Sequence, residues 1–486
     1  MFVRQIKSRK STCFQIGQKQ FGRFMLVKHI GCATTPAEIE ALRIKAKTEL
    51  GGIVLKNQLS LFPEVKLPLK AKLLAWHITG FHQVFGTVYD RIGFPRGLLR
   101  DLVIARIVYP KSKSATIRYL KRYLGINLSK DTVYRFQDTL SKDELTGIAF
   151  TFVSQKDKGV SLFFYDVTTL YFETENEDDF RKKGFSKNHR SDMPQILIGL
   201  FVDSEGYPFD FDFFEGNTFE GHTFQSAIGN IIRKYAFAEM TVVADAAMLS
   251  EKNLSYLQSR GISYIVGARL KNLPDETKNT VFRYDFAGNS ILVITSGQQK
   301  LIVDYSEDRA KKDEKTRERL IRKLETRLER KEQVVRKSKY ILWEKQGKVA
   351  GIDKRQIEED KKYDGLKGYI TDKENKSTAQ EIIKQYHNLW KVEKAFRMSK
   401  NDLKERPIYH QSVTRIKSHL IICFVSLLVM KETEKILSRK HYSLEKTIEI
   451  LGKVGQGEIR IGKIRLEIDS ELDEEVQLIL KLFTGH

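Results

Sequence analysis

Cysteine is scarce in this sequence, and its placement excludes two kinds of structural crosslink. Only three cysteines occur among 486 residues, at Cys13, Cys32 and Cys423, and no two form a Cys-x-x-Cys pair. An odd number of scattered cysteines indicates neither a disulfide framework nor a structural zinc site. We therefore expect reduced thiols and a cytoplasmic protein.

Long hydrophobic runs are also missing. The longest, from Leu420 to Met430, is interrupted by Ser426 and is shorter than the roughly 20 apolar residues that a membrane-spanning helix needs. The sequence does not open with a basic segment followed by an apolar stretch, as a signal peptide does. We expect no membrane partner.

Acidic residues are in deficit. The 62 Asp and Glu residues face 84 Lys and Arg residues, which gives a formal net charge of +22. The hydrophobic content of 41% is ample for a buried core. A globular chain with such a basic excess is expected to bind a polyanion rather than a small-molecule substrate.

The hydrophobic pattern changes several times along the chain, with only nine prolines to mark boundaries. Near the start, "FQIGQKQFGRFMLV" predicts a β-hairpin and "PAEIEALRIKAKTEL" a short helix. The spacing is helical from about residue 66 to 150. Strand patterns follow in "VSLFFYDVTTLYFE", "PQILIGLFVD" and "YPFDFDFFEGN", and helices and strands then alternate.

The helical region contains a helix-turn-helix pattern, "SATIRYLKRYLGINLSKDTVYRFQDTL". Gly125 suits the turn after the first helix, and Ser129 suits the N-cap of the second. Arg122, Lys130 and Arg135 are basic side chains placed to contact DNA if the second helix enters a major groove.

An ordinary pair of solvated helices is an equally good interpretation of this segment. If Val133 and Phe136 point inward, the helical period turns Asp131, Arg135 and Asp138 outward. Two acids on that face would repel phosphates unless they accept hydrogen bonds from cytosine amines.

Three carboxylates stand in settings that require an explanation. Asp166 lies in the middle of an apolar strand, where an ionised carboxylate must be paired, metal-bound or neutralised. Asp245 ends the strand "TVVAD", and the carboxyl ends of strands are where ligands collect in open α/β sheets. Glu393 is the one acid in the aromatic and basic helix "YHNLWKVEKAFRMSK". Taken alone, Glu393 would pair with Arg397 on a solvated face.

Taken together, these segments resemble the Asp, Asp, Glu triad of bacterial insertion-sequence transposases of the DDE type, in the superfamily named for insertion sequence four. Tyr386, Glu393 and Lys400 are similar to the family signature Tyr-x2-Arg-x3-Glu-x6-Lys, although Leu389 occupies its Arg position. The blocks "GFSKNHRSDMPQILIGLFVD", "FFEGNTFEGHTF" and "KNDLKERPIYH" resemble the branch named for insertion sequence sixteen thirty-four. The likeness runs from about residue 70 to 430.

The resemblance implies an α/β fold with a ribonuclease H-like core, a mixed five-stranded sheet flanked by helices. The first Asp would lie in mid-strand, the second at the end of the fourth strand, and the Glu on a helix after an insertion. Within this insertion, "FRYDFAGNSILVITSGQQKLIVDYS" and "KYILWEKQGKVAGIDKR" are expected to form strands. The intervening segment 307–340, with Ile321, Leu324, Leu328 and Val335 as an apolar stripe, predicts a long exposed helix.

The resemblance also implies a two-metal phosphodiester chemistry. Asp166, Asp245 and Glu393 would be the catalytic and metal-binding residues, holding two Mg²⁺ ions, for which Mn²⁺ is a possible substitute. Tyr386, Lys400 and Arg397 would contact DNA phosphates beside them, with Arg397 or Lys391 in place of the missing signature Arg.

Two further features leave alternatives open. Asp210 and Asp212 share one face of a strand and are interpreted as a solvent-facing edge or as a second metal site. Trp343 and Trp390 are interpreted as core side chains or as platforms for an unpaired base.

The functional hypothesis is a transposase that binds the terminal inverted repeats of its element, cleaves the DNA and joins the 3′ ends to target DNA. It would act as a homodimer, in the cytoplasm and nucleoid of a bacterium. A nuclease of the same fold without strand transfer, or an inactive DNA-binding relative, is the alternative. The expected regions are an N-terminal hairpin and helix (1–65), a helical DNA-binding domain (66–150), the first part of the catalytic core (155–275), an insertion (276–372), the second part of the core (373–431) and a C-terminal dimerisation region (432–486).

Overall fold

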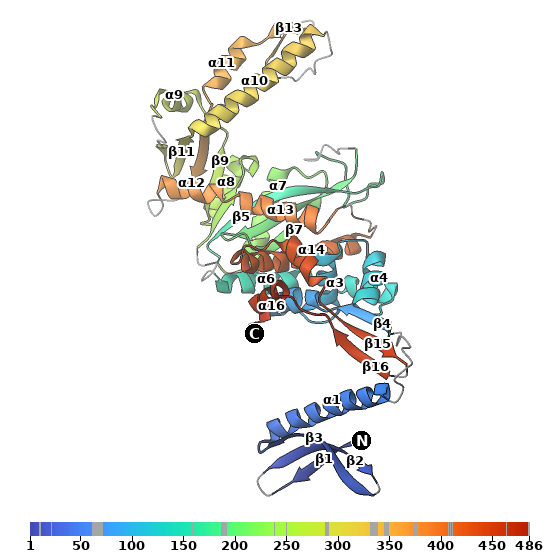
Figure 1. Ribbon diagram of the computed structural model, residues 1–486. Coiled ribbons are helices and arrows are strands. Elements are labelled where there is room, and N and C mark those ends of the chain that lie inside the picture. The colour runs from blue at the N-terminus through green and yellow to red at the C-terminus, as the bar shows by residue number, and fades with distance from the viewer. Residues whose placement is uncertain are drawn as a thin grey trace. The chain divides into compact units, whose positions relative to one another are not determined.

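Figure 1 shows a computed structural model of the chain, in which the helices and strands fall into two compact units. The structure describes residues 1–8, 11–20, 22–60, 71–156, 160–185, 192–237, 239–248, 250–286, 291–330, 339–344, 349–372, 378–406, 408, 410, 412–462 and 464–484, with only the backbone for 55–60. One unit comprises Met1–Leu74 and Ile459–Leu466, and the other comprises Ala75–Glu458 and Glu467–His486. The predicted regional boundaries remain predictions, since these units follow a different division.

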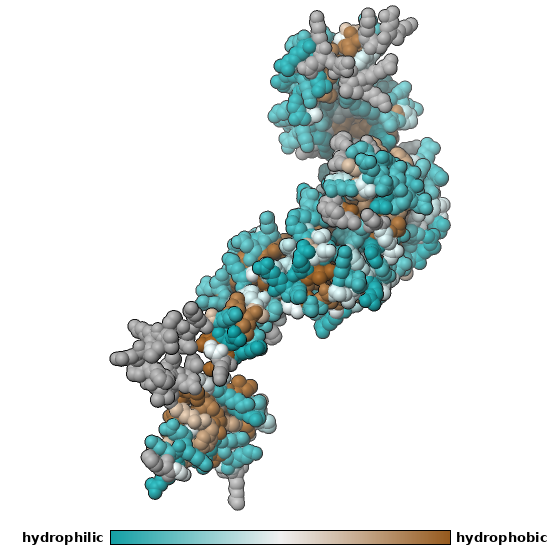
Figure 2. All heavy atoms as spheres, turned by 90° about the vertical axis from the view of Figure 1, so that its right-hand side faces the viewer, coloured by the Kyte–Doolittle hydropathy of each residue, from teal (hydrophilic) through white to brown (hydrophobic). Residues whose placement is uncertain are grey.

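The N-terminal unit is built on an antiparallel sheet in the order β1-β2-β3. Its elements are β1 Phe2–Lys7, β2 Thr12–Gln20, β3 Arg23–Ala33 and helix α1 Pro36–Ser60. The predicted hairpin is confirmed as β2 and β3, and α1 is longer than the short helix expected. In β2, Phe14 and Ile16 are buried because alternate side chains point to the same face of a strand. Figure 2 shows hydrophobic residues at the surface of this unit, where Met25 and Leu26 of β3 are exposed.

The expectation of reduced thiols is wrong for two of the three cysteines. Cys13 and Cys32 form a disulfide across the β2–β3 hairpin, while Cys423 is free and buried. The register of the hairpin pairs these two residues directly. Two cysteines separated by 19 residues give no local spacing motif, so the pairing becomes visible only once the strand register is known.

Helices dominate the chain between residues 82 and 156. They are η1 His82–Gly86, α2 Thr87–Ile92, α3 Leu98–Val108, α4 Lys113–Leu124, α5 Lys130–Asp138 and α6 Lys142–Lys156. Two helices joined by a turn form where they were predicted: Gly125 takes a left-handed conformation with φ 69°, and the Ser129 side chain accepts a hydrogen bond from the Thr132 amide. Val133 is buried and Arg135 exposed, as the helical period predicted.

An eight-stranded mixed sheet forms the centre of the larger unit, in the order β10-β11-β14-β9-β8-β5-β6-β7. Strand β5 pairs with β8, and β8 with β9, in parallel, while the other neighbours are antiparallel. The strands are β5 Leu162–Tyr171, β6 Gln195–Asp203, β7 Pro208–Glu215, β8 Thr241–Ala244, β9 Ser263–Ala268, β10 Ile291–Ser296, β11 Gln299–Tyr305 and β14 Leu366–Thr371. The expected count of five strands is therefore wrong, because three later strands extend the edge beyond β9.

Short helical elements connect the strands of this sheet. They are α7 Glu220–Lys234, η2 Ala246–Met248, α8 Glu251–Ser259, η3 Leu270–Asn272 and α9 Asp275–Arg283. The buried side chains of α7 include Phe224, Ala227 and Ile228, which join the main hydrophobic core.

The segment predicted as an insertion, residues 276–372, contains both strands and a long helix. Helix α10 spans Glu307–Glu329, followed by β12 Ile341–Trp343, β13 Val349–Ile352 and α11 Lys354–Lys361. Leu324 of α10 packs with Tyr340, Ile341 and Ile357 in a small separate core, while most of the helix is exposed, as predicted. Val335, the last residue of the predicted stripe, lies outside the described residues.

Four helical elements follow the insertion and complete this core. They are α12 Ala379–His387, α13 Trp390–Arg397, η4 Met398–Asp402 and α14 Val413–Ser438. By length and composition α14 could cross a membrane, but 78% of its most apolar window is buried inside the structure. Its apolar side chains, among them Leu420, Phe424 and Leu428, belong to the same core as the sheet.

The C-terminal region contributes α15 Leu444–Leu451, β15 Gly455–Ile461, β16 Ile464–Asp469 and α16 Glu474–Thr484. Strands β16, β15 and β4 (Ala71–Ile78) form a three-stranded sheet. The apolar face of α16, with Val476, Ile479 and Phe483, is buried in the chain's own core. Part of the surface considered for a dimer contact is therefore already covered within one chain.

Candidate active site

Asp166 and Asp245 are brought to the same level of the sheet by two neighbouring parallel strands. The register pairs Tyr165 of β5 with Ala244 of β8. The next residues along these strands are Asp166 and Asp245. The pairing thus joins two acids that are distant in sequence, in the strand positions that the resemblance implied.

Both aspartates are half-buried, and each accepts a local backbone hydrogen bond. Asp166 lies between the buried residues Tyr165 and Val167, and its Oδ1 accepts from the Val167 amide at 2.8 Å. Asp245 begins the turn into η2, and its Oδ1 accepts from the Ala247 amide at 2.8 Å. Partial exposure in mid-strand means that the layer covering the sheet is open at Asp166, so that its charge is less costly than in a closed core.

The segment that carries Glu393 is not the single helix expected from sequence. Residues 386–400 span the end of α12, all of α13 and the start of the π-helix η4. Leu389, at the signature's Arg position, is 8% exposed and belongs to the hydrophobic core. Because its side chain is buried, Leu389 cannot contact a phosphate. It stabilises the hydrophobic core instead.

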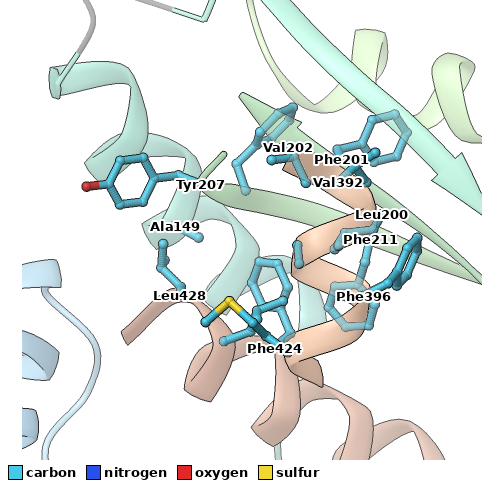
Figure 3. Close-up of a cluster of buried hydrophobic side chains, with 14 of the residues drawn as sticks. Ala149, Leu200, Phe201, Val202, Tyr207, Phe211, Val392, Phe396, Phe424 and Leu428 are labelled. Atoms are coloured by element: carbon cyan, nitrogen blue, oxygen red, sulfur yellow. The ribbon is translucent and has the colours of Figure 1, made fainter. Parts of the chain in front are cut away.

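Hydrophobic packing holds α13 against the Asp166 face of the sheet. Leu200 of β6 lies directly opposite Asp166 in the register, and directly opposed side chains point to the same face. Figure 3 shows Val392 and Phe396 of α13 beside Leu200 and Phe211, with Phe424 of α14 below them. The rings of Phe211 and Phe424 stack with centroids 4.8 Å apart. Glu393, one residue after buried Val392, remains exposed on this anchored helix.

The charges of all three acids affect the pKa of Tyr386. Burial raises the pKa of the Tyr386 hydroxyl to about 12, with further contributions from the negative charges of Asp245, Glu393 and Asp166. Its hydroxyl lies over the backbone of β9, where a side chain at Gly267 would clash with it. The three carboxylates therefore lie near enough to Tyr386 for their charges to act on its hydroxyl.

Two lysines contact residues of this site. Lys400 of η4 donates a hydrogen bond to the hydroxyl of Thr168, which is two residues beyond Asp166 and on the same face of β5. The Nζ atom of Lys367 in β14 lies 4.9 Å from the centroid of the Tyr386 ring. Its pKa is lowered, because burial and the charge of Arg309 outweigh the opposing charges of Asp304 and Glu393. Lys400 was predicted as a site residue, whereas Lys367 was not, because no local pattern connects β14 with the signature.

The donor set suits a hard divalent cation. Three carboxylates from β5, the end of β8 and α13 supply oxygen ligands of the kind that Mg²⁺ prefers, and Mg²⁺ needs only one or two carboxylates besides water and phosphate. In the described part of the chain, however, no three His, Cys, Asp or Glu residues form a group able to hold one ion. The residues thus fit a site that is completed by the phosphates of a substrate rather than a closed protein cage.

A cavity of about 510 Å³ adjoins Asp245. Ala247, whose amide binds Asp245, contributes to its wall together with His222, Lys252 and Arg269. Phe219, 64% exposed, forms another part of the wall. Part of the sequence block "FFEGNTFEGHTF" therefore lines this cavity, while Lys252 and Arg269 were not singled out from sequence.

The remaining predicted DNA contacts lie on α5, α4 and α13. Lys130 and Arg135 line an open hollow of about 510 Å³ on α5, with Asp131 and Arg415. Arg122 is exposed on α4, and Arg397 is exposed on α13. Of the two residues considered as replacements for the signature Arg, Lys391 donates to the Ser204 carbonyl, so it is engaged at the β6–β7 turn.

Two sequence interpretations concerning other residues are wrong. Asp210 and Asp212 are 2% and 8% exposed, not solvent-facing. Asp210 accepts hydrogen bonds from Lys234 at 2.9 Å and from the Tyr235 hydroxyl at 2.6 Å, and Asp212 forms an ion pair with Lys142. Trp390, preferred as a core residue, is 50% exposed at the start of α13.

Comparison with known proteins places this geometry in a family. The family model described as "Transposase DDE domain" matches residues 158–429, which is more than half of the chain and contains all three acids. No curated protein matches the sequence. Among solved structures, a piggyBac transposase synaptic complex with hairpin DNA is 11% identical, with a TM-score of 0.37 over 77% of this chain and 76% of that one. A Mos1 transposase paired-end complex with left transposon end is 9% identical, with a TM-score of 0.17 over 37% of this chain and 56% of that one. On the family match, this chain belongs to the DDE-domain transposases.

Proposed function

We propose that this transposase acts on the terminal inverted repeats of an insertion sequence, cleaves the DNA there and joins the 3′ ends to a target. Within the family we assign it to the branch of insertion sequence sixteen thirty-four in the superfamily of insertion sequence four, with a ribonuclease H-like catalytic core. The observation that carries the proposal is the placement of Asp166 and Asp245 at one level of two neighbouring strands, with Glu393 near enough to act on the same Tyr386 hydroxyl, inside the family-matched region.

Asp166, Asp245 and Glu393 are the residues that would hold two divalent ions, Mg²⁺ in the first instance. Such ions activate an oxygen nucleophile and relieve the negative charge of the phosphodiester. The exposure of Glu393 on the rim suits a ligand that meets the other two acids when a DNA strand lies between α13 and the sheet. Lys400, beside Thr168, positions the scissile phosphate by its charge.

The basic helices supply DNA binding away from the acids. Arg135 and Lys130 face the open hollow of α5 and would reach base edges and phosphates, while Arg122 contacts the backbone. Arg397 and the exposed Trp390 flank Glu393 on α13 and would contact the strand near the cut, Trp390 by stacking on an unpaired base. Two ends must be cut and joined together, so a homodimer is the expected assembly, in the cytoplasm and nucleoid of its host.

Incubation of the purified chain with Mg²⁺ and a duplex carrying the ends of its own element tests the proposal. Cleavage at the element boundary, followed by joined products with a target plasmid, is the expected result, and both should disappear with a chelator. Cleavage without joined products would reduce the function to that of a nuclease. Specific binding without cleavage in Mg²⁺ or Mn²⁺ would make the chain an inactive DNA-binding relative.

A further inference from the structure

A second basic cavity lies apart from the three acids, between α3, the start of α4 and α14. It has a volume of about 610 Å³, within the range of pockets that hold small organic ligands. Arg106, Lys113, Arg406 and His419 line it, each from a different element or loop. No sequence motif drew attention to this combination.

Positive charge is buried in this cavity, and no carboxylate among the described residues forms an ion pair with it. Arg106 and Lys113 are each 5% exposed. Within the described residues, Arg106 donates one hydrogen bond, to the Leu403 carbonyl at 3.4 Å. Among the residues described, no carboxylate forms an ion pair with Arg106, Lys113 or Arg406. A buried charge without a partner is costly, so a compensating anion is the simplest way to stabilise this arrangement.

One buried acid, Glu405, lies near this positive charge without forming an ion pair with it in the described structure. Glu405 is 6% exposed, and its carboxyl group accepts a hydrogen bond from Ser399 at 2.7 Å. Burial raises the pKa of Glu405, although its Ser399 hydrogen bond and the charges of Lys400, Arg106 and Arg406 act to lower it. Its backbone carbonyl, not its side chain, faces His419, at 3.1 Å from Nε2.

Several lining groups carry unused hydrogen-bonding capacity. In the described structure, Nδ1 of His419 and Nη1 of Arg406 are buried without hydrogen-bond partners, and His419 is 5% exposed. The first turn of α4, residues Lys113 to Ala115, forms one wall, and a helix N-terminus favours a negative charge. Burial and the charge of Arg106 lower the pKa of Lys113 to about 7, and burial, Lys113 and Arg106 lower that of His410 to about 4.

We propose that this cavity is a binding site for a phosphate group, held by Lys113 and Arg106 with Arg406, His419 and the start of α4. A phosphate dianion balances two buried cations and accepts several hydrogen bonds, which matches the unpaired donors. The group can come from the end of a DNA strand or from a free phosphate compound. None of Asp166, Asp245 and Glu393 lines this cavity, and its test does not depend on cleavage.

Thermal unfolding of the full chain, without DNA, measures the site directly. Wild-type protein in potassium phosphate should melt several degrees higher than in potassium chloride of equal ionic strength, and the shift should saturate. Lys113→Met should abolish the phosphate-specific shift. Its melting temperature in chloride should equal or exceed that of wild type, because an uncompensated buried charge is removed.

Lys121→Met is the matched control, since Lys121 is exposed on the same helix and outside the cavity. It should keep the full phosphate shift. Should Lys113→Met fail to fold, Arg406→Gln provides the second variant, with a weakened shift expected. Equal melting in phosphate and chloride, or an unchanged shift in the cavity variants, would overturn the proposal.

A DNA arm distinguishes the two sources. Duplexes that differ only in a 5′-phosphate or 5′-hydroxyl end are titrated against wild type, Lys113→Met and Lys121→Met. A preference for the phosphorylated end that only Lys113→Met loses assigns the site to strand ends. Equal affinity for both ends, together with the phosphate-specific thermal shift, assigns it to a free phosphate compound.

Discussion

At the scale of single residues, Asp166 combines two properties that a structural aspartate rarely combines. It lies in the interior of a strand whose neighbours Tyr165 and Val167 are buried, yet it is itself half-buried. Asp166 therefore keeps partial contact with solvent within a covered strand, and the register places Asp245, which follows β8, beside it. A phosphodiester can approach an acid in such a position without unfolding the core.

Lys400→Ala should slow cleavage and weaken binding at the cut site without changing sequence preference. Lys400 reaches Thr168 on the Asp166 face, so its loss misplaces the scissile phosphate, for which small shifts are costly. Cleavage rates and affinities for element ends and random DNA provide the measurement. Lys394→Ala is the control, because the Lys394 ammonium is bound to Glu434 at 2.6 Å. A change of sequence preference in Lys400→Ala would contradict the assigned role.

Asp210→Asn should lower the free energy of unfolding while leaving the cleavage rate per folded molecule unchanged. Removal of one partner from a buried ion pair costs roughly 3 kcal/mol, because the other charge remains without compensation, and Asp210 is bound to Lys234 and Tyr235. Chemical denaturation gives the stability, and a cleavage assay at low temperature gives the rate. Loss of cleavage in a fully folded variant would instead support a second metal site.

The three acids could be selected from sequence because each stands in an improbable local setting, and the family signature links them. Their joint effect on Tyr386 could not be foreseen, because it arises only after β5, β8 and α13 have packed. Asp210 was misjudged because alternation shows that the faces of a strand differ but does not show what covers each face. Here Lys142 of α6 and Lys234 of α7 cover the polar one.

At the scale of elements, the signature segment is divided into pieces that a helical pattern does not distinguish. α12 ends at His387, α13 carries Glu393, and η4 carries Lys400. A π-helix contains an additional residue per turn and is often found at functional sites, so η4 changes the direction of Lys400 relative to Glu393. Sequence periodicity predicted helix over the whole segment but could not predict this break.

The pairing of strands was also only partly predictable from sequence. Strands β5 to β9 follow the alternation and apolar runs of the sequence, and most were predicted as strands. The joining of β14, β11 and β10 to the edge of β9 was not predicted. An apolar strand carries no local mark of its partner, and pairing over long sequence distances depends on the whole fold.

Arg135→Ala should reduce discrimination between element ends and random DNA by about 1–3 kcal/mol, because a side chain that reads a base edge contributes that much. Arg135 is exposed on α5 beside the open hollow, where Asp131 is also present. Arg122→Ala, on the exposed face of α4, should weaken both DNAs alike. Competition binding with the two DNAs separates these outcomes. If Arg135→Ala weakened binding to element ends and to random DNA equally, α5 would be only a charged surface.

At the scale of the whole molecule, the net charge of +22 should make DNA binding steeply dependent on salt. Each neutralised phosphate releases counterions, so the logarithm of the affinity should fall with the logarithm of salt concentration at a slope near −0.9 per contact. Titrations at several potassium chloride concentrations measure this slope. A slope close to that of a single contact would contradict an extended DNA interface.

The central claim is that Asp166, Asp245 and Glu393 perform metal-dependent DNA cleavage. Its most direct test is end cleavage by Asp166→Cys in Mg²⁺ and in Mn²⁺, compared with Asp166→Asn, Asp245→Asn and Glu393→Gln, and with DNA binding measured in parallel. Asp402→Asn, an exposed acid on η4, serves as the control. We predict no cleavage by the three amide variants, normal DNA binding by all of them, and cleavage by Asp166→Cys in Mn²⁺ alone, because a thiolate is a poor ligand for Mg²⁺. Undiminished cleavage by any amide variant, or loss of DNA binding in step with cleavage, would contradict the account.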